Sequence, residues 1–234
     1  MLFRIISRKA APGRPKIIMH MKKGVFITFE GTEGCGKSTQ SKLLYDYLKR
    51  AGYGCVYTRE PGGTGLGEKI RETLLHSKNI EISDLAELFL FEAARAQVVR
   101  EIISPALKDK KIIVCDRFYD ATTAYQGCGG KVSLKTIRAL NDIASGGIKP
   151  DLTILLDVDI NTGLRRAKKK GSDRMEAKKL AYHKRVRAGY LALAKKEPNR
   201  IKVVKVEEDI AITQDKIRKI VLKTICHFRV SGNP

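Results

Sequence analysis

A chain of 234 residues, 43% hydrophobic and 30% charged, has the size and composition of one α/β domain, and no apolar run in it approaches the roughly eighteen residues of a membrane span. The five cysteines are scattered and lack a CxxC spacing, which argues against a disulfide framework and a zinc motif and indicates a reducing cytoplasm. The net charge of +21 favours an anionic partner and leaves nucleic acid, a membrane surface and a phosphorylated small molecule open.

The first twenty residues form a basic segment without acidic side chains, interrupted by two prolines. We expect a disordered extension over residues 1–20, followed by one domain over 21–234. A transit peptide stays open, because such segments are rich in arginine and poor in acid. An over-extended start also stays open, because Met19 and Met21 offer later start sites.

Short apolar runs alternate with helical patterns along the rest of the chain. The runs are nearly continuous in apolar residues, as in strands buried on both faces of a parallel sheet, and they are 25–29, 54–58, 111–115, 152–157 and 201–206. Helices are predicted at 37–51, 67–76, 84–108, 133–144, 160–169, 175–194 and 210–227. The helix over 84–108 lacks one clean apolar stripe, so we expect it to be largely buried. The alternation predicts an α/β fold with ligands at the carboxyl ends of the strands.

The stretch FEGTEGCGKSTQ joins the first predicted strand to the first predicted helix and contains the pattern G-x(4)-G-K-[ST]. Its glycines let backbone N–H groups turn inward around an anion, and the helix start adds positive charge. Lys37 is expected to neutralise the β- and γ-phosphates, and Ser38 to ligate Mg²⁺. The predicted ATP-binding residues are Gly31, Thr32, Glu33, Gly34, Cys35, Gly36, Lys37, Ser38 and Thr39.

Cys35 lies inside this loop, beside a helix start and a lysine, where a thiol can have a lowered pKa. A small filler residue is the simpler interpretation. A redox switch is an alternative hypothesis that the position alone motivates.

Three further signatures narrow the class of enzyme. They are TREPGGT at 58–64, FEAAR at 91–95, and DRF at 116–118, which is followed by Thr122 and by AYQG at 124–127. Together they resemble the bacterial thymidylate kinases, from about residue 21 to the C-terminal helix. The resemblance implies a P-loop NTPase fold of the nucleoside monophosphate kinase type, with a five-stranded parallel sheet flanked by helices and a mobile lid. It also implies a cytoplasmic homodimer that transfers the γ-phosphoryl group of ATP to dTMP with Mg²⁺, with no nucleic-acid or membrane partner.

By the same resemblance, Phe91 stacks on the thymine base and Arg95, four residues along the same helix, reads the base. A core position is the alternative for Phe91, whereas a guanidinium in an apolar helix needs a partner. Thr122 and Gln126 border the nucleotide, and Tyr125 crowds the sugar C2′ against a ribonucleotide.

Arg71 and Arg117 are expected to bind the acceptor phosphate. The resemblance implies this role for Arg71, which corresponds to the family's arginine on the helix after EPGG, and a planar guanidinium suits phosphate. Asp116 ends the third strand and is expected to hold Mg²⁺ or its water, with a structural cap as the alternative. Glu60 resembles an acidic residue near the acceptor site. The bond before Pro61 is a candidate for the cis form, as in relatives.

The basic segment over about 165–178 corresponds to the lid of these kinases, although a solvated charged helix is the ordinary interpretation of such a run. The phosphate loop lacks an arginine, and in bacterial members with that pattern the catalytic arginine comes from the lid and meets the charge of the transferring phosphoryl group. Arg165 and Arg174 are the first candidates, ahead of Arg166. For Arg174→Ala, this assignment predicts a loss of kcat rather than a rise in the KM for dTMP. Other lid residues with an expected role are Gly171 and Ser172, as a pliable point, and Glu176, as the acid of the lid motif.

The predicted catalytic residues are therefore Lys37, Asp116, Arg117, Arg165 and Arg174, and the predicted Mg²⁺ ligands are Ser38 and Asp116. Two rival functions remain. One is another nucleotide or deoxynucleoside kinase. The other is a nucleic-acid-binding P-loop protein, motivated by the net charge, although such a protein would need aromatic residues interleaved with Lys and Arg, and the chain has no Trp.

Overall fold

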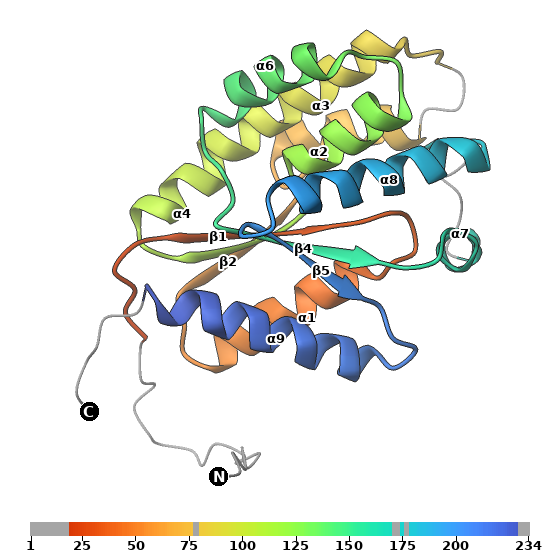
Figure 1. The fold of residues 1–234 in the computed structure, drawn as a ribbon. Helices are drawn as coiled ribbons and strands as arrows, with labels where there is room; N and C mark the ends of the chain where they lie inside the picture. Colours follow the sequence, from red (N-terminus) through yellow and green to blue (C-terminus); the bar gives the residue numbers. More distant parts are fainter. Residues whose placement is uncertain (1–18, 77–79, 170–173, 176–177, 229–234) are drawn as a thin grey trace.

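The computed structural model describes residues 19–76, 80–169, 174–175 and 178–228. Five parallel strands form one sheet in the order β2-β3-β1-β4-β5 (Figure 1). The strands are β1 (Val25–Glu30), β2 (Cys55–Arg59), β3 (Ile112–Asp116), β4 (Leu152–Asp157) and β5 (Ile201–Lys205). The order places β1 at the centre, between β3 and β4.

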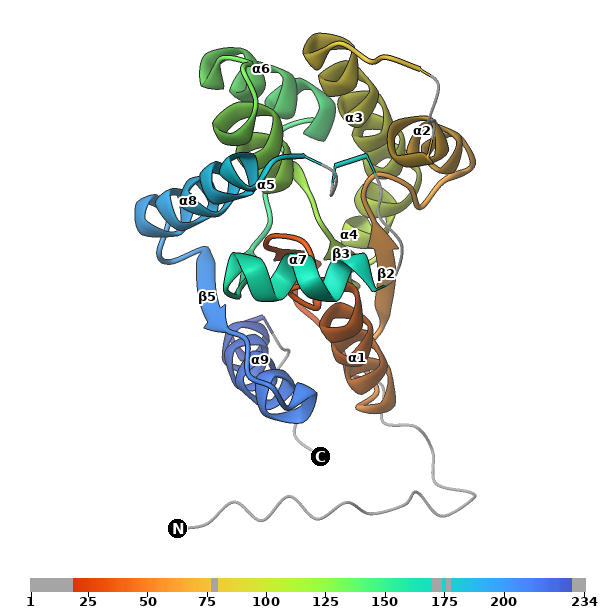
Figure 2. The same ribbon diagram turned by 90° about the vertical axis from the view of Figure 1, so that its right-hand side faces the viewer.

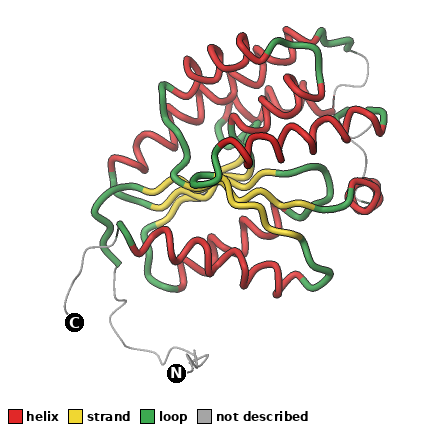
Figure 3. The backbone as a smooth tube through the Cα atoms, in the orientation of Figure 1, coloured by secondary structure: helices red, strands yellow, loops and turns green. Residues whose placement is uncertain are grey.

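Helices cover both faces of the sheet and make a three-layer molecule (Figures 1 and 3). One face is covered by α1 (Lys37–Arg50) and α9 (Ile210–Cys226). The other carries α2 (Gly65–His76), α3 (Asp84–Val98), α4 (Ser104–Lys108), α5 (Tyr119–Thr122), α6 (Leu134–Ser145) and α8 (Leu180–Lys196). Helix α7 (Ile160–Lys168) lies beyond the carboxyl ends of the strands, the end of the sheet that faces the viewer in Figure 2. In the described residues no helix is both long and apolar enough to cross a membrane.

The central strands are buried on both faces, which explains their nearly continuous apolar sequence. Alternate residues of β1 face opposite layers: Ile27 packs in the cluster that contains Leu44 of α1 and Ile217 of α9, whereas Phe26 packs in the cluster with Val98 of α3. In register, Phe29 of β1 and Arg59 of β2 both pair with Asp116 of β3, so these strands end at one level.

The predicted helix over 84–108 is interrupted by a π-helical turn, η1 (Val99–Ile103), between α3 and α4. Pro105 explains the interruption, because proline lacks the N–H of a regular helix and its ring crowds the carbonyl four residues earlier. The expectation that this helix is largely buried is also wrong: Leu85 and Phe89, one turn apart, are 49% and 51% exposed.

A helical segment was missed between β3 and α6. Helix α5 runs on into a π-helical turn, η2 (Thr123–Gly129), in a segment where the sequence analysis predicts no helix. In addition, the helix predicted at 175–194 begins at Leu180. The predicted extension over 1–20 is slightly too long, because Met19 forms a parallel bridge with Tyr53, while residues 1–18 lie outside the described residues.

Candidate active site

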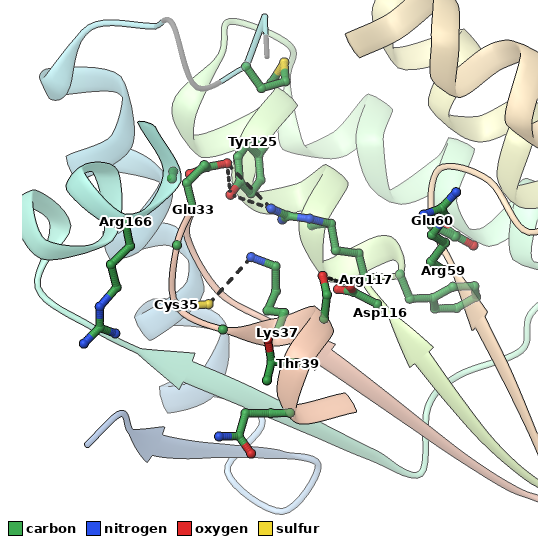
Figure 4. A pocket seen from close by; sticks show the side chains of 18 of the residues that line it. Glu33, Cys35, Lys37, Thr39, Arg59, Glu60, Asp116, Arg117, Tyr125 and Arg166 are labelled. Atoms are coloured by element: carbon green, nitrogen blue, oxygen red, sulfur yellow. Dashed lines mark hydrogen bonds and ion pairs between the residues drawn. The ribbon is translucent and has the colours of Figure 1, made fainter. Parts of the chain in front are cut away.

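A cavity of about 700 Å³ opens at the carboxyl ends of β1, β2 and β3 (Figure 4). It is lined by the loop after β1, the TREPG segment after β2, the DRF segment after β3, and side chains of α2, α3, η2 and α7. Parallel strands bring these separate sequence motifs to one edge of the sheet. The cavity therefore unites most of the residues that the sequence singles out.

The phosphate loop wraps the start of α1. Gly31, Gly34 and Gly36 have positive φ angles of 139°, 64° and 91°, which L side chains rarely adopt. Gly34 also approaches α7 so closely that a Cβ atom would lie 2.0 Å from the carbonyl oxygen of Gly163. The Lys37 ammonium donates to the carbonyl oxygens of Gly31 (2.9 Å) and Thr32 (2.8 Å), so its charge is held over the loop.

Two side chains with oxygen atoms that could hold a divalent cation lie side by side. The Ser38 hydroxyl, at the start of α1, donates to the carboxylate of Asp116, at the end of β3. The described residues contain no group of three or more His, Cys, Asp or Glu side chains that could hold a metal ion. A site of one hydroxyl and one carboxylate still suits Mg²⁺, which keeps several waters and takes further oxygens from substrate phosphates.

Arg117 reaches into the same cavity from the other side of the loop, as Figure 4 shows. Its guanidinium lies over the Tyr125 ring, 4.8 Å from the centroid, and 3.6 Å from the Glu33 carboxylate. The Tyr125 hydroxyl donates to Glu33 at 2.6 Å. The charge of Arg117 is thus held between η2 and the phosphate loop.

Glu33 carries a firmly ionised carboxylate. Burial alone would raise the pKa of Glu33, but the contact with His183 and the charges of Arg117 and Lys37 outweigh burial and lower that pKa to about 2. The Nδ1 atom of His183 lies 3.3 Å from Glu33 Oε2, and its Nε2 atom lies 3.1 Å from the Lys178 carbonyl oxygen. A buried histidine therefore connects the phosphate loop to the start of α8.

Sequence reasoning missed this histidine and two other residues, Tyr190 and Glu30, none of which lines the cavity itself. Tyr190 donates to Glu30 Oε2 at 2.7 Å, and the backbone N–H of Phe118 donates to Glu30 Oε1 at 2.7 Å. Burial and the neighbouring Asp120 raise the pKa of Glu30 to about 8. A signal was present for Glu30, because a charged residue ends an apolar strand, whereas no spacing marks the contact of His183 with Glu33.

The side of the cavity next to α3 is organised around Arg95, which is 2% exposed. Its Nε donates to Glu60 at 2.9 Å, its Nη1 to Glu92 and to Asn141 at 2.8 Å each, and its Nη2 to Thr122 at 2.8 Å. The expected need for a partner is met by two carboxylates. A guanidinium has five N–H groups, and one on Nη2 has no partner among the described residues, so it is available to a ligand.

Of the two carboxylates that bind Arg95, Glu60 accepts the fewer hydrogen bonds. Its Oε1 atom is buried and has no hydrogen-bond partner in the described part of the chain. Burial raises the pKa of Glu60 to about 7, although Arg95 acts in the opposite direction. The Glu60–Pro61 peptide bond is cis. Among the other predicted substrate residues, Arg71, Phe91, Thr122 and Gln126 line the cavity, so Phe91 is not sealed in the core.

The lid candidates are placed differently from expectation. Arg165 is exposed and lies near Thr162 of its own helix, outside the cavity, whereas Arg166 and Lys169 line the cavity. Successive helical residues point about 100° apart, so the neighbour of an inward residue points away. Arg174 donates to Glu87 of α3 and to the Leu74 carbonyl oxygen, and it does not line the cavity. Residues 171, 172 and 176 lie outside the described residues.

Cys35 is expected to be unreactive. The thiol is 1% exposed, and burial raises the pKa of Cys35 even though Lys37 and Arg117 act the other way, so the lowered pKa considered from the sequence is wrong. Iodoacetamide at pH 7.5 should modify the exposed Cys226 faster than Cys35, because the Cys35 thiol is buried and its raised pKa lowers the fraction of reactive thiolate. Peptide mass mapping measures both rates, and equal rates would contradict the expectation.

Comparison with known proteins identifies the family of this chain. The family model described as thymidylate kinase matches residues 29–217. The chain belongs to the thymidylate kinase family.

Relatives named thymidylate kinase agree with this membership. One from Dehalococcoides mccartyi is 48% identical over 201 residues, covering 86% of this chain and 95% of the relative. One from Desulfosudis oleivorans is 49% identical over 188 residues, covering 77% of this chain and 88% of the relative. The crystal structure of thymidylate kinase from Ehrlichia chaffeensis superimposes with a TM-score of 0.71 at 35% identity, covering 85% of this chain and 99% of that chain. Both the predicted fold class and the predicted enzyme family are confirmed.

Membership of the thymidylate kinase family explains why the cavity has two cationic sides. A phosphoryl-transfer enzyme must hold a donor and an acceptor that are both anionic, and Lys37 and Arg117 provide positive charge on either side of the loop. The family supports a kinase that phosphorylates dTMP with ATP over the two rival functions.

Proposed function

We propose that this cavity transfers the γ-phosphoryl group of ATP to the 5′-phosphate of dTMP, giving dTDP. The observation that carries the proposal is that Lys37 of the phosphate loop, and Arg117 and Arg71 beside the acceptor side, open onto one cavity. A single phosphoryl group can cross between two such sites only if they share a water-poor space.

On the donor side, residues 31–39 bind the ATP phosphates through backbone N–H groups and the Lys37 ammonium. The Lys37 ammonium donates to loop carbonyl oxygens, which phosphate oxygens would replace. Val206, Ile210 and Thr213 line the end of the cavity next to the phosphate loop and offer the donor base a partly apolar surface.

Ser38 and Asp116 are the residues that would hold Mg²⁺. When bound, the ion supplies positive charge to the donor phosphates. The contact between the two side chains supports this assignment, and it also accounts for Asp116 without a role as a helix cap.

On the acceptor side, Phe91 provides the stacking surface for thymine, and the remaining Nη2 hydrogen of Arg95 meets a base oxygen. The Tyr125 ring lies beside the sugar and sterically excludes a 2′-hydroxyl group. The hydrogen bond from its hydroxyl to Glu33 fixes the position of the tyrosine ring. Arg71 and Arg117 hold the acceptor phosphate. These assignments use groups that line the cavity and that neighbouring residues hold in place. Arg71, for example, donates to the Pro61 carbonyl oxygen at 2.9 Å.

Arg166 is the arginine of α7 that we propose for the charge of the transferring phosphoryl group. It lines the cavity, whereas Arg165 does not. This reverses the order in which the sequence ranked the two residues. Positioning and charge carry the rate, because a loose phosphoryl-transfer transition state needs no general base.

A homodimer that pairs the outer face of α3 fits the exposed apolar residues of that face. Leu85 and Phe89 form an apolar strip of about half-exposed side chains, and Leu66 of α2 is 49% exposed. Charged residues at 85 and 89 should then yield a monomer in sedimentation, while an unchanged mass would contradict this interface.

The cytoplasmic location stays a prediction from the sequence.

The function is tested by following ADP release with dTMP, dUMP, dCMP and GMP side by side. We expect turnover with dTMP to exceed that with the other acceptors. A higher turnover with one of them would favour another nucleotide kinase. Steeply salt-dependent retention on DNA together with no dTMP-dependent ATP turnover would favour the nucleic-acid-binding rival.

A further inference from the structure

We propose that Arg174 is a positioning residue of the acceptor-base site, which it holds through Glu87 and Gln126, and is not the arginine that meets the transferring phosphoryl group. This rests on the proposed function, because it assigns Gln126 to the acceptor nucleotide. It replaces the role that the sequence predicted for Arg174.

Arg174 is fixed to the end of α2 and to α3 by its backbone and its side chain. Its backbone N–H donates to the Leu75 carbonyl oxygen at 3.3 Å, and its Nε donates to the Leu74 carbonyl oxygen at 2.9 Å. Its Nη2 donates to Oε2 of Glu87. With these anchors the guanidinium faces α3, and only the next residue, Met175, lines the cavity.

Glu87 relays the position of Arg174 to the cavity. The residue is 3% exposed, and its two carboxylate oxygens have different partners: Oε2 accepts from Arg174, and Oε1 accepts from Gln126 Nε2 at 2.9 Å. A buried carboxylate needs a compensating charge. Without the guanidinium, an amide alone would have to stabilise this anion, and the side chain would turn towards water.

The bond to Glu87 fixes the polarity of the Gln126 amide. A carboxylate only accepts, so the NH₂ group of Gln126 must face Glu87, and the amide oxygen is left for the cavity that Gln126 lines. An acceptor oxygen at this place suits a pyrimidine that carries a ring N–H, such as thymine, and not cytosine, whose ring nitrogen is itself an acceptor. Loss of Arg174 would free the amide to rotate and serve either base.

The kinetic test uses Arg174→Ala, Arg174→Lys and, as a matched surface control, Arg138→Ala on α6, which is exposed. We expect Arg174→Ala to raise the KM for dTMP about tenfold, the worth of roughly one hydrogen bond to a charged group, with kcat within about threefold of the parent. The ratio of kcat/KM for dTMP over dCMP should fall. Arg174→Lys should recover part of both effects, and Arg138→Ala should match the parent.

A loss of kcat of about 10²-fold or more at an unchanged KM for dTMP would overturn the proposal, since that is the signature of a group acting on the transition state. So would an unchanged dTMP-to-dCMP ratio, because a residue that only stabilises the fold leaves base preference intact.

A double-mutant cycle with Glu87→Gln tests the relay itself. If Arg174 acts through Glu87, adding Arg174→Ala to Glu87→Gln should weaken dTMP binding little further. Additive losses would contradict the relay. The dissociation constant for dTMP, measured by calorimetry, tests the relay without requiring catalytic turnover. If Arg174→Ala folds poorly, the cycle can be run with Arg174→Lys and Glu87→Gln, which are milder changes.

The two proposals fail in different ways. A parent enzyme that phosphorylates another nucleoside monophosphate and not dTMP would refute the proposed function. The same binding cycle with that acceptor would then support the relay if the losses are non-additive, and overturn it if they are additive.

Discussion

Replacing Lys37 by methionine is expected to lower kcat for dTMP phosphorylation by about 10³-fold, the scale on which an enzyme loses a charge aimed at a developing anion. Methionine keeps most of the length and apolar volume of the side chain but cannot donate to the phosphates. The Lys37 ammonium is the cation that the phosphate loop itself holds over the donor site, through bonds to Gly31 and Thr32. Single-turnover kinetics at saturating ATP and dTMP measure the chemical step.

Lys42→Met is the matched control for this variant, because Lys42 lies on the same helix, α1, and is half exposed next to Asp46. We expect parent-like turnover from it. If Lys37→Met changed only the KM for ATP and left kcat intact, the ammonium would serve uniform binding, and its assignment to the transferring group would be wrong.

The largest loss of stability is expected from Arg95→Met. Removing one partner of a buried ion cluster leaves uncompensated charges, and here the carboxylates of Glu60 and Glu92 lose their shared guanidinium. The free energy of unfolding should fall by about 3–5 kcal/mol, measured in urea. The exposed pair of Arg59 and Glu68 offers a control, in which Arg59→Met should cost less than about 1 kcal/mol.

The cost of Arg95→Met should grow with pH. Arg95 lowers the pKa of Glu60, which burial otherwise raises and which stands at about 7 in the parent. In the variant this pKa rises further, so the folded variant retains a proton that the unfolded chain has already lost. Stability then falls as pH rises, and the gap between parent and variant should widen above pH 7. A gap that narrows between pH 7 and 9 would contradict the charge-compensation argument.

The strands and the phosphate loop were predictable because their signals are local. An apolar run such as Ile112–Asp116 ends in charged residues that reach the cavity. The glycines of the phosphate loop indicate positive φ angles. The resemblance to thymidylate kinases then supplied the acceptor residues, of which Phe91 and Arg95 indeed line one cavity.

Features that depend on helix phase or on distant partners were not predictable. A π-helix such as η2 has more residues per turn than an α-helix, so its apolar residues do not follow the α-helical period, and the sequence predicts no helix there. Charge alone could not tell Arg165 from Arg166, because only the rotation of α7 separates them. Arg174 and His183 find their partners, Glu87 and Glu33, across the fold, and no spacing in the sequence reports such contacts.

The level ends of β1 and β3, where Phe29 pairs with Asp116, have a consequence for how such enzymes can diversify. Backbone hydrogen bonds between β1 and β3 hold the start of the phosphate loop beside Asp116. Substitutions on α2 and α3 can therefore change the lining of the cavity without moving Ser38 away from Asp116. A slip of β3 by one residue, in contrast, would turn Asp116 to the opposite face and separate it from Ser38.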